Sequence, residues 1–126
     1  MIFFFLTDYG LPIIDPELLE HGPKFILDPQ NKIYEATKDN PVKFVEFRCE
    51  ADADPYADYN WYRTRQQITT ELDPLLEVKL TITNGRLVIH NPEDSIDNGD
   101  YSCRAENKFG AVLSSSATLR FGCKYL

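Results

Sequence analysis

Short segments in which apolar and polar residues alternate recur along the chain, and turn-forming residues separate them. Alternation with a period of two is typical of β-strands with one buried face. The expected strands are residues 25–27, 32–35, 42–49, 59–63, 78–82, 86–90, 101–106 and 111–121. Residues 66–76 have the weakest pattern, and we expect a loop-rich segment there. The pattern therefore predicts an all-β protein.

The alternation also predicts which side chains face the core. In residues 59–63, Tyr59, Trp61 and Arg63 share one face, whereas Asn60 and Tyr62 share the other. In residues 86–90, preceded by the hairpin signal Asn84-Gly85, Leu87 and Ile89 point inward. In residues 101–106, Tyr101, Cys103 and Ala105 are expected on the core side.

Residues 42–49 do not fit a single alternating pattern. Phe44, Phe47 and Cys49 are not all an even number of positions apart. We therefore expect either a β-bulge or a strand whose beginning is buried on both faces.

The spacing of four residues identifies the fold. Trp61 follows Cys49 by 12 residues, Cys103 follows Cys49 by 54, and Tyr101 precedes Cys103 by two. Each could be an ordinary core residue when taken alone. Together they match the immunoglobulin β-sandwich, in which a tryptophan packs on a disulfide between the sheets and a tyrosine hydroxyl bonds to main chain at the corner between strands E and F. In the lettering of this fold, residues 42–49 are strand B, 59–63 strand C, 86–90 strand E, 101–106 strand F and 111–121 strand G.

This fold implies a Cys49–Cys103 disulfide joining two antiparallel sheets, a bond that persists in oxidising compartments. Asp97 and Gly99 suit the bend before Tyr101, because Asp caps tight turns and Gly accepts unusual backbone angles. The predicted core signature consists of Trp61, Leu87, Asp97, Gly99 and Tyr101.

The 126 residues fit one such domain, which we place at residues 24–122. Residues 1–23 are expected to be a linker or the tail of an upstream domain, and residues 123–126 the start of a following linker. The apolar run at residues 2–6 is too short for an export signal, so we expect a fragment of a longer protein. Cys123 is left over for an intermolecular bond or for a partner in a missing segment, and the simpler alternative is a small residue at a truncated end.

The net charge of −7 argues against binding nucleic acid or anionic lipid, and no run is long enough to enter a membrane. The two histidines, His21 and His90, lie in no catalytic arrangement, so we expect neither an enzyme nor a cofactor. The acidic residues 50–58 lack the glycine and closing glutamate of a calcium loop. We expect a solvated B–C loop there and no metal, although its charge could attract a basic partner.

Four residues are candidates for binding a partner protein: Tyr59, Tyr62, Lys108 and Phe109. They lie on or beside the expected strands C, F and G, and aromatic side chains with an exposed edge make good interface anchors. The alternative is that Tyr59 is partly core and that Phe109 only closes the F–G turn.

Two levels of family resemblance follow from short motifs. Residues 105–110, Ala-Glu-Asn-Lys-Phe-Gly, resemble the end of strand F in intermediate-set (I-set) immunoglobulin domains. Residues 22–25, 85–92, 107–110 and 119–122 together resemble the first immunoglobulin domain of contactins. Residues 8–12 and 72–75 are more similar to invertebrate contactins, in which a lectin-like domain comes first.

The resemblance implies a cell-surface adhesion module, acting at axon–glia contacts or septate junctions on the extracellular face of the plasma membrane. Its implied partners are immunoglobulin-superfamily or neurexin-type adhesion receptors. Two alternatives remain: an intracellular immunoglobulin spacer of a muscle or cytoskeletal protein with reduced cysteines, and the ectodomain of a signalling receptor.

Overall fold

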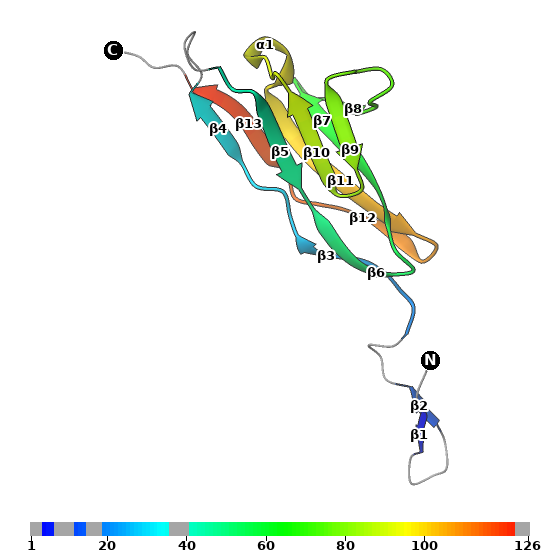
Figure 1. Ribbon diagram of the computed structural model, residues 1–126. Helices are drawn as coiled ribbons and strands as arrows, with labels where there is room; N and C mark the ends of the chain where they lie inside the picture. The colour runs from blue at the N-terminus through cyan, green and yellow to red at the C-terminus, as the bar shows by residue number, and fades with distance from the viewer. Residues whose placement is uncertain (1–3, 7–11, 15–18, 36–40, 123–126) are drawn as a thin grey trace.

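The computed structural model describes residues 4–6, 12–14, 19–35 and 41–122, and two layers of β-strands packed face to face make up its main body (Figure 1). The predictions for Cys123 and for residues 123–126 lie outside these residues. Residues 4–6 (β1) and 12–14 (β2) pair as a separate two-stranded sheet, which the sequence pattern did not predict.

The larger sheet has the order β4-β13-β11-β7-β8, and β12 also pairs with β11. Its strands are β4 (Lys32–Glu35), β7 (Asp58–Arg65), β8 (Ile68–Glu71), β11 (Gly99–Asn107), β12 (Gly110–Leu113) and β13 (Ala117–Gly122). The predicted antiparallel sheets have one exception among the described strands, because β4 runs parallel to β13. This geometry arises because the first strand of the sandwich is divided between the two layers. Its second half, β4, lies beside the last strand, β13.

The facing layer contains the sheet β5-β10-β9 and the pair β3-β6. Its strands are β3 (His21–Leu27), β5 (Phe44–Arg48), β6 (Glu50–Asp54), β9 (Leu80–Thr83) and β10 (Arg86–His90). A short helix, α1 (Asp94–Asp97), connects β10 to β11. The arrangement is an immunoglobulin-like sandwich, as the cysteine and tryptophan spacing predicted.

The core lies between the layers and draws side chains from both. Its largest fully buried members are Phe47, Trp61, Leu87, Ile89, Tyr101 and Leu119. The rings of Phe47 and Tyr101 stack with their centroids 4.9 Å apart. The Phe47 ring also contacts Trp61, at a centroid distance of 6.4 Å. Burying side chains of this size is the main stabilising contribution to a domain of this kind.

Most strand predictions are confirmed, and two are correct to the residue: 32–35 and 86–90. Strand β3 begins at His21, four residues earlier than predicted. Strand β9 begins at Leu80, two residues later than predicted, and Val78 is 94% exposed. The predicted loop-rich segment contains β8, which follows a two-residue turn at positions 66–67.

Neither explanation offered for residues 42–49 is correct. Val45, Phe47 and Cys49 all face the core, and Phe44 is 55% exposed on the opposite face. The strand therefore alternates regularly, and the irregularity came from counting an exposed phenylalanine as buried.

The predicted B–C loop, residues 50–58, is mostly strand: residues 50–54 form β6, β7 begins at Asp58, and only residues 55–57 form a loop. In β6, half-buried Ala51 and Ala53 alternate with exposed Glu50, Asp52 and Asp54. The strand pairs antiparallel with β3. The carboxylates therefore form one row on a sheet surface, and the small alanines face the layer beneath.

The predicted last strand, residues 111–121, is two strands broken at residues 114–116. Ser114 causes the break, because its hydroxyl accepts a hydrogen bond from the Cys103 backbone nitrogen at 2.9 Å. The Ser114 nitrogen donates to the Cys103 carbonyl at 2.7 Å. A side chain here takes the place of a backbone acceptor, so the regular ladder stops.

Candidate interaction surfaces

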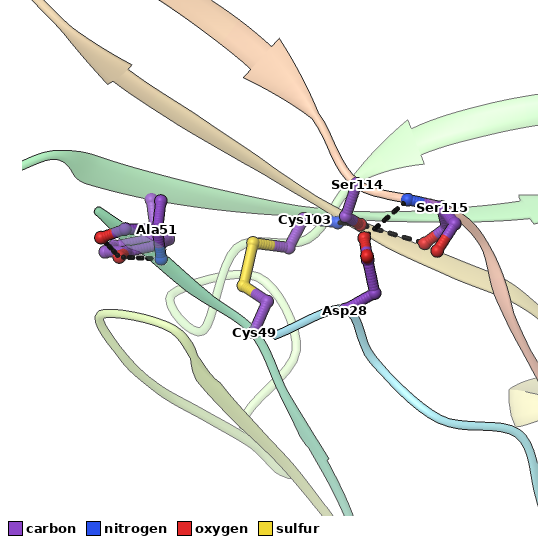
Figure 2. Close-up of a disulfide and its surroundings, with 7 residues drawn as sticks. Asp28, Cys49, Ala51, Cys103, Ser114 and Ser115 are labelled. Atoms are coloured by element: carbon purple, nitrogen blue, oxygen red, sulfur yellow. Dashed lines mark hydrogen bonds between the residues drawn. A yellow bond between two sulfur atoms is a disulfide. The ribbon is translucent and has the colours of Figure 1, made fainter. Parts of the chain in front are cut away.

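The disulfide between Cys49 and Cys103 fixes the two layers to each other (Figure 2). The Cα atoms are 6.6 Å apart, and both residues are buried. Trp61 is the strand partner of Cys103 on β7 and has no exposed surface. The two cysteines are 54 positions apart in sequence. A disulfide that closes a loop of this length stabilises a fold by about 4 kcal/mol in the chain-entropy description.

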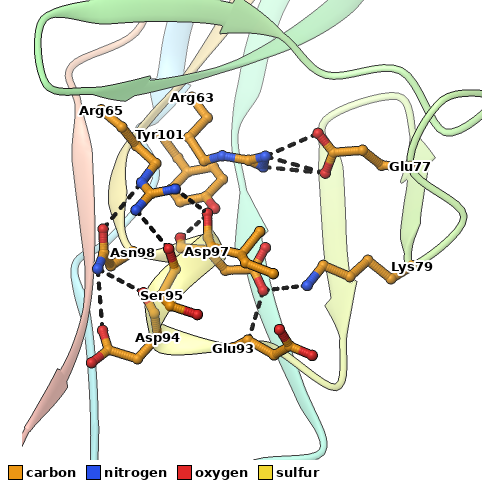
Figure 3. Close-up of polar contacts among 11 residues, drawn as sticks. Arg63, Arg65, Glu77, Lys79, Glu93, Asp94, Ser95, Asp97, Asn98 and Tyr101 are labelled. Carbon is orange, nitrogen blue, oxygen red and sulfur yellow. Dashed lines mark hydrogen bonds and ion pairs between the residues drawn. The ribbon is translucent and has the colours of Figure 1, made fainter.

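The hydroxyl of Tyr101 bonds to the main chain at the E–F corner (Figure 3). It donates to the carbonyl oxygen of Asp97 at 2.6 Å. Burial raises the pKa of the Tyr101 phenol well above its usual value, because the ionised form would lose its hydration. The hydroxyl therefore remains a donor under all physiological conditions.

The carboxylate of Asp97 organises the same corner from a fully buried position. One oxygen, Oδ2, accepts from the backbone nitrogen of Glu93 at 2.7 Å and pairs with the ammonium of Lys79. Gly99 has φ +144°, and a Cβ there would lie 2.9 Å from the Thr64 carbonyl oxygen. The predicted roles of these residues at the bend thus correspond to specific contacts in the structure.

Two arginines of β7 tie further segments to this corner. Arg63, which is buried, bonds the Glu77 carboxylate through Nη2 at 2.9 Å. Arg65 donates from its guanidinium to the carbonyls of Ser95 and Ile96, each at 2.8 Å (Figure 3). The sequence analysis did not identify either contact, since each joins residues far apart in sequence.

Tyr59 and Tyr62, two of the predicted partner-binding residues, lie on opposite faces of β7. Tyr59 faces inward, where its hydroxyl accepts a hydrogen bond from the Ala51 nitrogen at 3.0 Å. Tyr62 is half-buried on the outer face, between its strand partners Ser102 and Glu71. The two tyrosines therefore do not belong to one surface, and Tyr62 is the one available from outside.

Lys108 and Phe109 form the tip of the F–G turn. The Lys108 ammonium lies 5.1 Å from the centre of the Phe109 ring and 2.8 Å from Oε2 of Glu20. Phe109 is 53% exposed. The pair thus presents an aromatic edge beside a cation, a combination favoured at protein interfaces.

Asn107 holds this turn in place through three hydrogen bonds. Its side-chain nitrogen donates to the carbonyls of His21 at 2.8 Å and Pro55 at 3.0 Å. Its side-chain oxygen accepts from the Phe109 nitrogen at 2.9 Å. The F–G turn, β3 and the B–C connection at Pro55 are therefore joined at one residue.

An exposed apolar segment between β8 and β9 did not feature in the sequence analysis. Leu75 and Leu76 are 89% and 82% exposed, and Val78 is almost fully exposed. Leu76 and Glu71 line a surface groove of about 480 Å³. The signal available in the sequence was the run of leucine and valine within a segment without strand alternation.

Chemistry at the remaining polar groups is limited. Over the ranges that the structure describes, no group of three or more His, Cys, Asp or Glu residues is arranged to hold a metal ion. His90 bonds the Thr81 hydroxyl at 3.1 Å, and His21 lies 3.8 Å from Asp52. No helix within the described part of the chain is long and apolar enough to cross a membrane.

Several solved structures have the same fold as this chain. The N-terminal Ig1-2 module of the Drosophila receptor protein tyrosine phosphatase DLAR is 24% identical, with a TM-score of 0.67, covering 85% of this chain and 50% of that one. Dscam, in a structure that explains isoform specificity, is 15% identical with a TM-score of 0.68, covering 90% and 30%. Identities this low show similarity of fold alone.

Sequence comparisons are more specific. The family model described as immunoglobulin domain matches residues 23–107. Contactin of Drosophila melanogaster is 37% identical over 118 residues, which are 90% of this chain and 8% of that protein. Contactin-5 of Danio rerio is 38% identical over 102 residues, which are 81% of this chain and 9% of that protein. The chain thus spans less than a tenth of the length of either relative, and it belongs to the immunoglobulin domain family, with a domain of the contactin type.

Proposed function

We propose that the chain is a recognition module for cell adhesion at the extracellular face of the plasma membrane, in contacts of the neural or septate-junction type. The identity to Drosophila contactin over 90% of the chain carries this proposal. The Cys49–Cys103 bond supports an extracellular location, because such bonds persist in oxidising compartments. The role is binding and not catalysis.

In this proposal residues 24–122 are the binding domain, residues 1–23 come from an upstream region, and residues 123–126 begin a linker to the next domain. The partners are immunoglobulin-superfamily or neurexin-type adhesion receptors. The chain is, in this proposal, one module of a longer adhesion protein, and its small share of its relatives' length supports that part of the proposal.

Lys108 and Phe109 are the side chains we propose for direct contact, with Tyr62 as a second site on the outer face of β7. Phe109 offers apolar area with little ordering cost, because Asn107 already fixes its backbone. The Lys108 ammonium is shared with Glu20 at the surface, where ion pairs exchange readily with those of a partner. Tyr59, held inward by Ala51, positions the neighbouring strand.

A binding screen tests the proposal. The 126-residue chain, multimerised on a tag, is applied to purified ectodomains of immunoglobulin-superfamily and neurexin-type receptors. We expect a specific partner whose binding falls at least about tenfold with Phe109→Ala, as for an interface anchor worth more than 1.4 kcal/mol. Ile33→Ser, a change at an exposed apolar residue of β4 (71% exposed, against 53% for Phe109), is the control and leaves binding unchanged.

Two outcomes contradict the proposal. Binding to none of these ectodomains removes the adhesion role and favours the intracellular spacer. Binding that survives Phe109→Ala and Tyr62→Ala together keeps the role but places the contact surface elsewhere.

A further inference from the structure

Strand β8 forms one edge of the larger sheet, and all four of its residues are exposed. It contains no proline and a single charged residue, Glu71, which accepts a hydrogen bond from Asn60 at 2.8 Å. Proteins usually protect such an edge with charges, prolines or a covering loop, because unpaired backbone groups attract another strand. Among residues 4–6, 12–14, 19–35 and 41–122, nothing but the shortness of the strand protects this edge.

The hydrogen-bond pattern shows which backbone groups of β8 are free. The Leu72 nitrogen donates to the Trp61 carbonyl at 2.8 Å, and the register pairs Thr70 with Arg63 and Ile68 with Arg65. Because hydrogen-bonded and non-hydrogen-bonded pairs alternate in an antiparallel ladder, the groups of positions 68, 70 and 72 point toward β7. Those of Thr69 and Glu71 point away from the sheet.

Two free positions separated by one residue allow a self-complementary pairing. A two-fold axis at Thr70 places Thr69 of each copy opposite Glu71 of the other, and the free groups form four hydrogen bonds. In this register Glu71 faces a threonine and not a second carboxylate, so no like charges are opposed. The register centred on Glu71 would oppose two carboxylates.

The same register brings apolar surface together. It places the residues after Glu71 in one copy alongside Ile68 in the other, because the strands run in opposite directions. Ile68 is two-thirds exposed, and Leu75 and Leu76 are more exposed still. Leu76 already lines the groove beside Glu71, so the apolar segment lies at the end of the free edge. Each copy therefore offers both halves of the contact.

We propose that the chain forms a two-fold symmetric dimer in which β8 of one copy pairs with β8 of a second copy and the leucine segments close over Ile68. The dimer continues the larger sheet through both molecules. Because it names one partner for the recognition module, this inference rests on the proposed function, although its test needs only the purified chain.

Sedimentation equilibrium of the 126-residue chain tests the dimer, with Cys123→Ser in every sample so that an intermolecular disulfide cannot imitate it. We expect a reversible dimer with a dissociation constant on the order of 10–100 µM, appropriate to a small transient interface. Thr69→Pro should weaken it at least about tenfold, because it removes a free-edge donor and no backbone hydrogen bond to β7. It also removes the Thr69 hydroxyl, which bonds the Thr64 hydroxyl of β7 at 2.8 Å, and Thr69→Ala controls for that loss. Thr69→Ala, which keeps that donor, should retain the dimer.

The double substitution Leu75→Ser and Leu76→Ser tests the apolar contact and should also weaken the dimer at least about tenfold. Ile33→Ser, at the opposite edge strand, should leave it unchanged. A chain that stays monomeric up to about 1 mM, a concentration at which even a weak interface associates, overturns the proposal. So does a dimer that tolerates Thr69→Pro. Neither outcome bears on the ectodomain screen, so failure of the dimer and failure of the adhesion role are distinguishable.

Discussion

Replacing Tyr101 by phenylalanine isolates a single hydrogen bond at the E–F corner. The substitution removes the hydroxyl that donates to the Asp97 carbonyl at 2.6 Å. It keeps the ring that stacks on Phe47 and lies under the Arg63 guanidinium. The change in stability therefore reports the hydrogen bond and not the packing of the ring.

The magnitude follows from burial. Asp97 and Tyr101 both have no exposed surface, so water cannot replace the lost donor and the Asp97 carbonyl stays unpaired. Leaving a buried acceptor unsatisfied costs about 1–3 kcal/mol. We expect Tyr101→Phe to lower the free energy of unfolding by this amount, with an unchanged dependence on denaturant concentration because the surface exposed on unfolding is the same.

Urea denaturation of both proteins, followed by tryptophan fluorescence, measures the difference. Trp61 is the only tryptophan and lies in the core, so its emission reports the global transition. Tyr62→Phe is the matched control, since Tyr62 is half-buried on the outer face, and it should change stability by less than about 0.5 kcal/mol. A loss for Tyr101→Phe no larger than that of the control would refute the reasoning.

Three further changes test other parts of the fold. Trp61→Ala should cost about 3–5 kcal/mol through a core cavity, and a loss below about 1 kcal/mol in denaturant titration would contradict the core position. Gly85→Ala should prevent folding, seen as loss of the native circular dichroism spectrum, because a Cβ there would lie 2.0 Å from the Cys49 carbonyl oxygen. Wild-type stability should fall above pH of about 10, by up to about 1.4 kcal/mol per pH unit, because the Tyr101 phenol ionises in the unfolded state but its raised pKa keeps it protonated in the folded state. Urea titrations at pH 9 to 11 should show a smaller fall for Tyr101→Phe, and an equal fall would contradict the linkage.

The sequence was sufficient where local pattern and the buried face coincide. Residues 86–90 were predicted to the residue, because Asn84-Gly85 fixes the turn and Leu87 and Ile89 face the core. The spacing of Cys49, Trp61 and Cys103 was enough to predict the sandwich.

The sequence was insufficient where a strand has no buried face or depends on a distant residue. All residues of β8 are exposed, so no alternation of apolar residues could mark it. In β6 the half-buried positions are alanines, which give too weak an apolar signal among three carboxylates. The break at residues 114–116 in the predicted last strand depends on a hydrogen bond that the Cys103 nitrogen donates to the Ser114 hydroxyl. The two residues are 11 positions apart in sequence, so the local pattern does not reveal this contact.

Asn107 has a consequence for the kinetics of recognition. Its three hydrogen bonds join β3, the B–C connection and the F–G turn before any partner binds. A partner therefore meets a surface that is already ordered, and little conformational entropy is lost on docking. Adhesion modules work in arrays of many weak contacts, where each bond must form rapidly when two membranes approach. A preordered F–G turn suits that requirement, because binding needs no folding step before the complex forms.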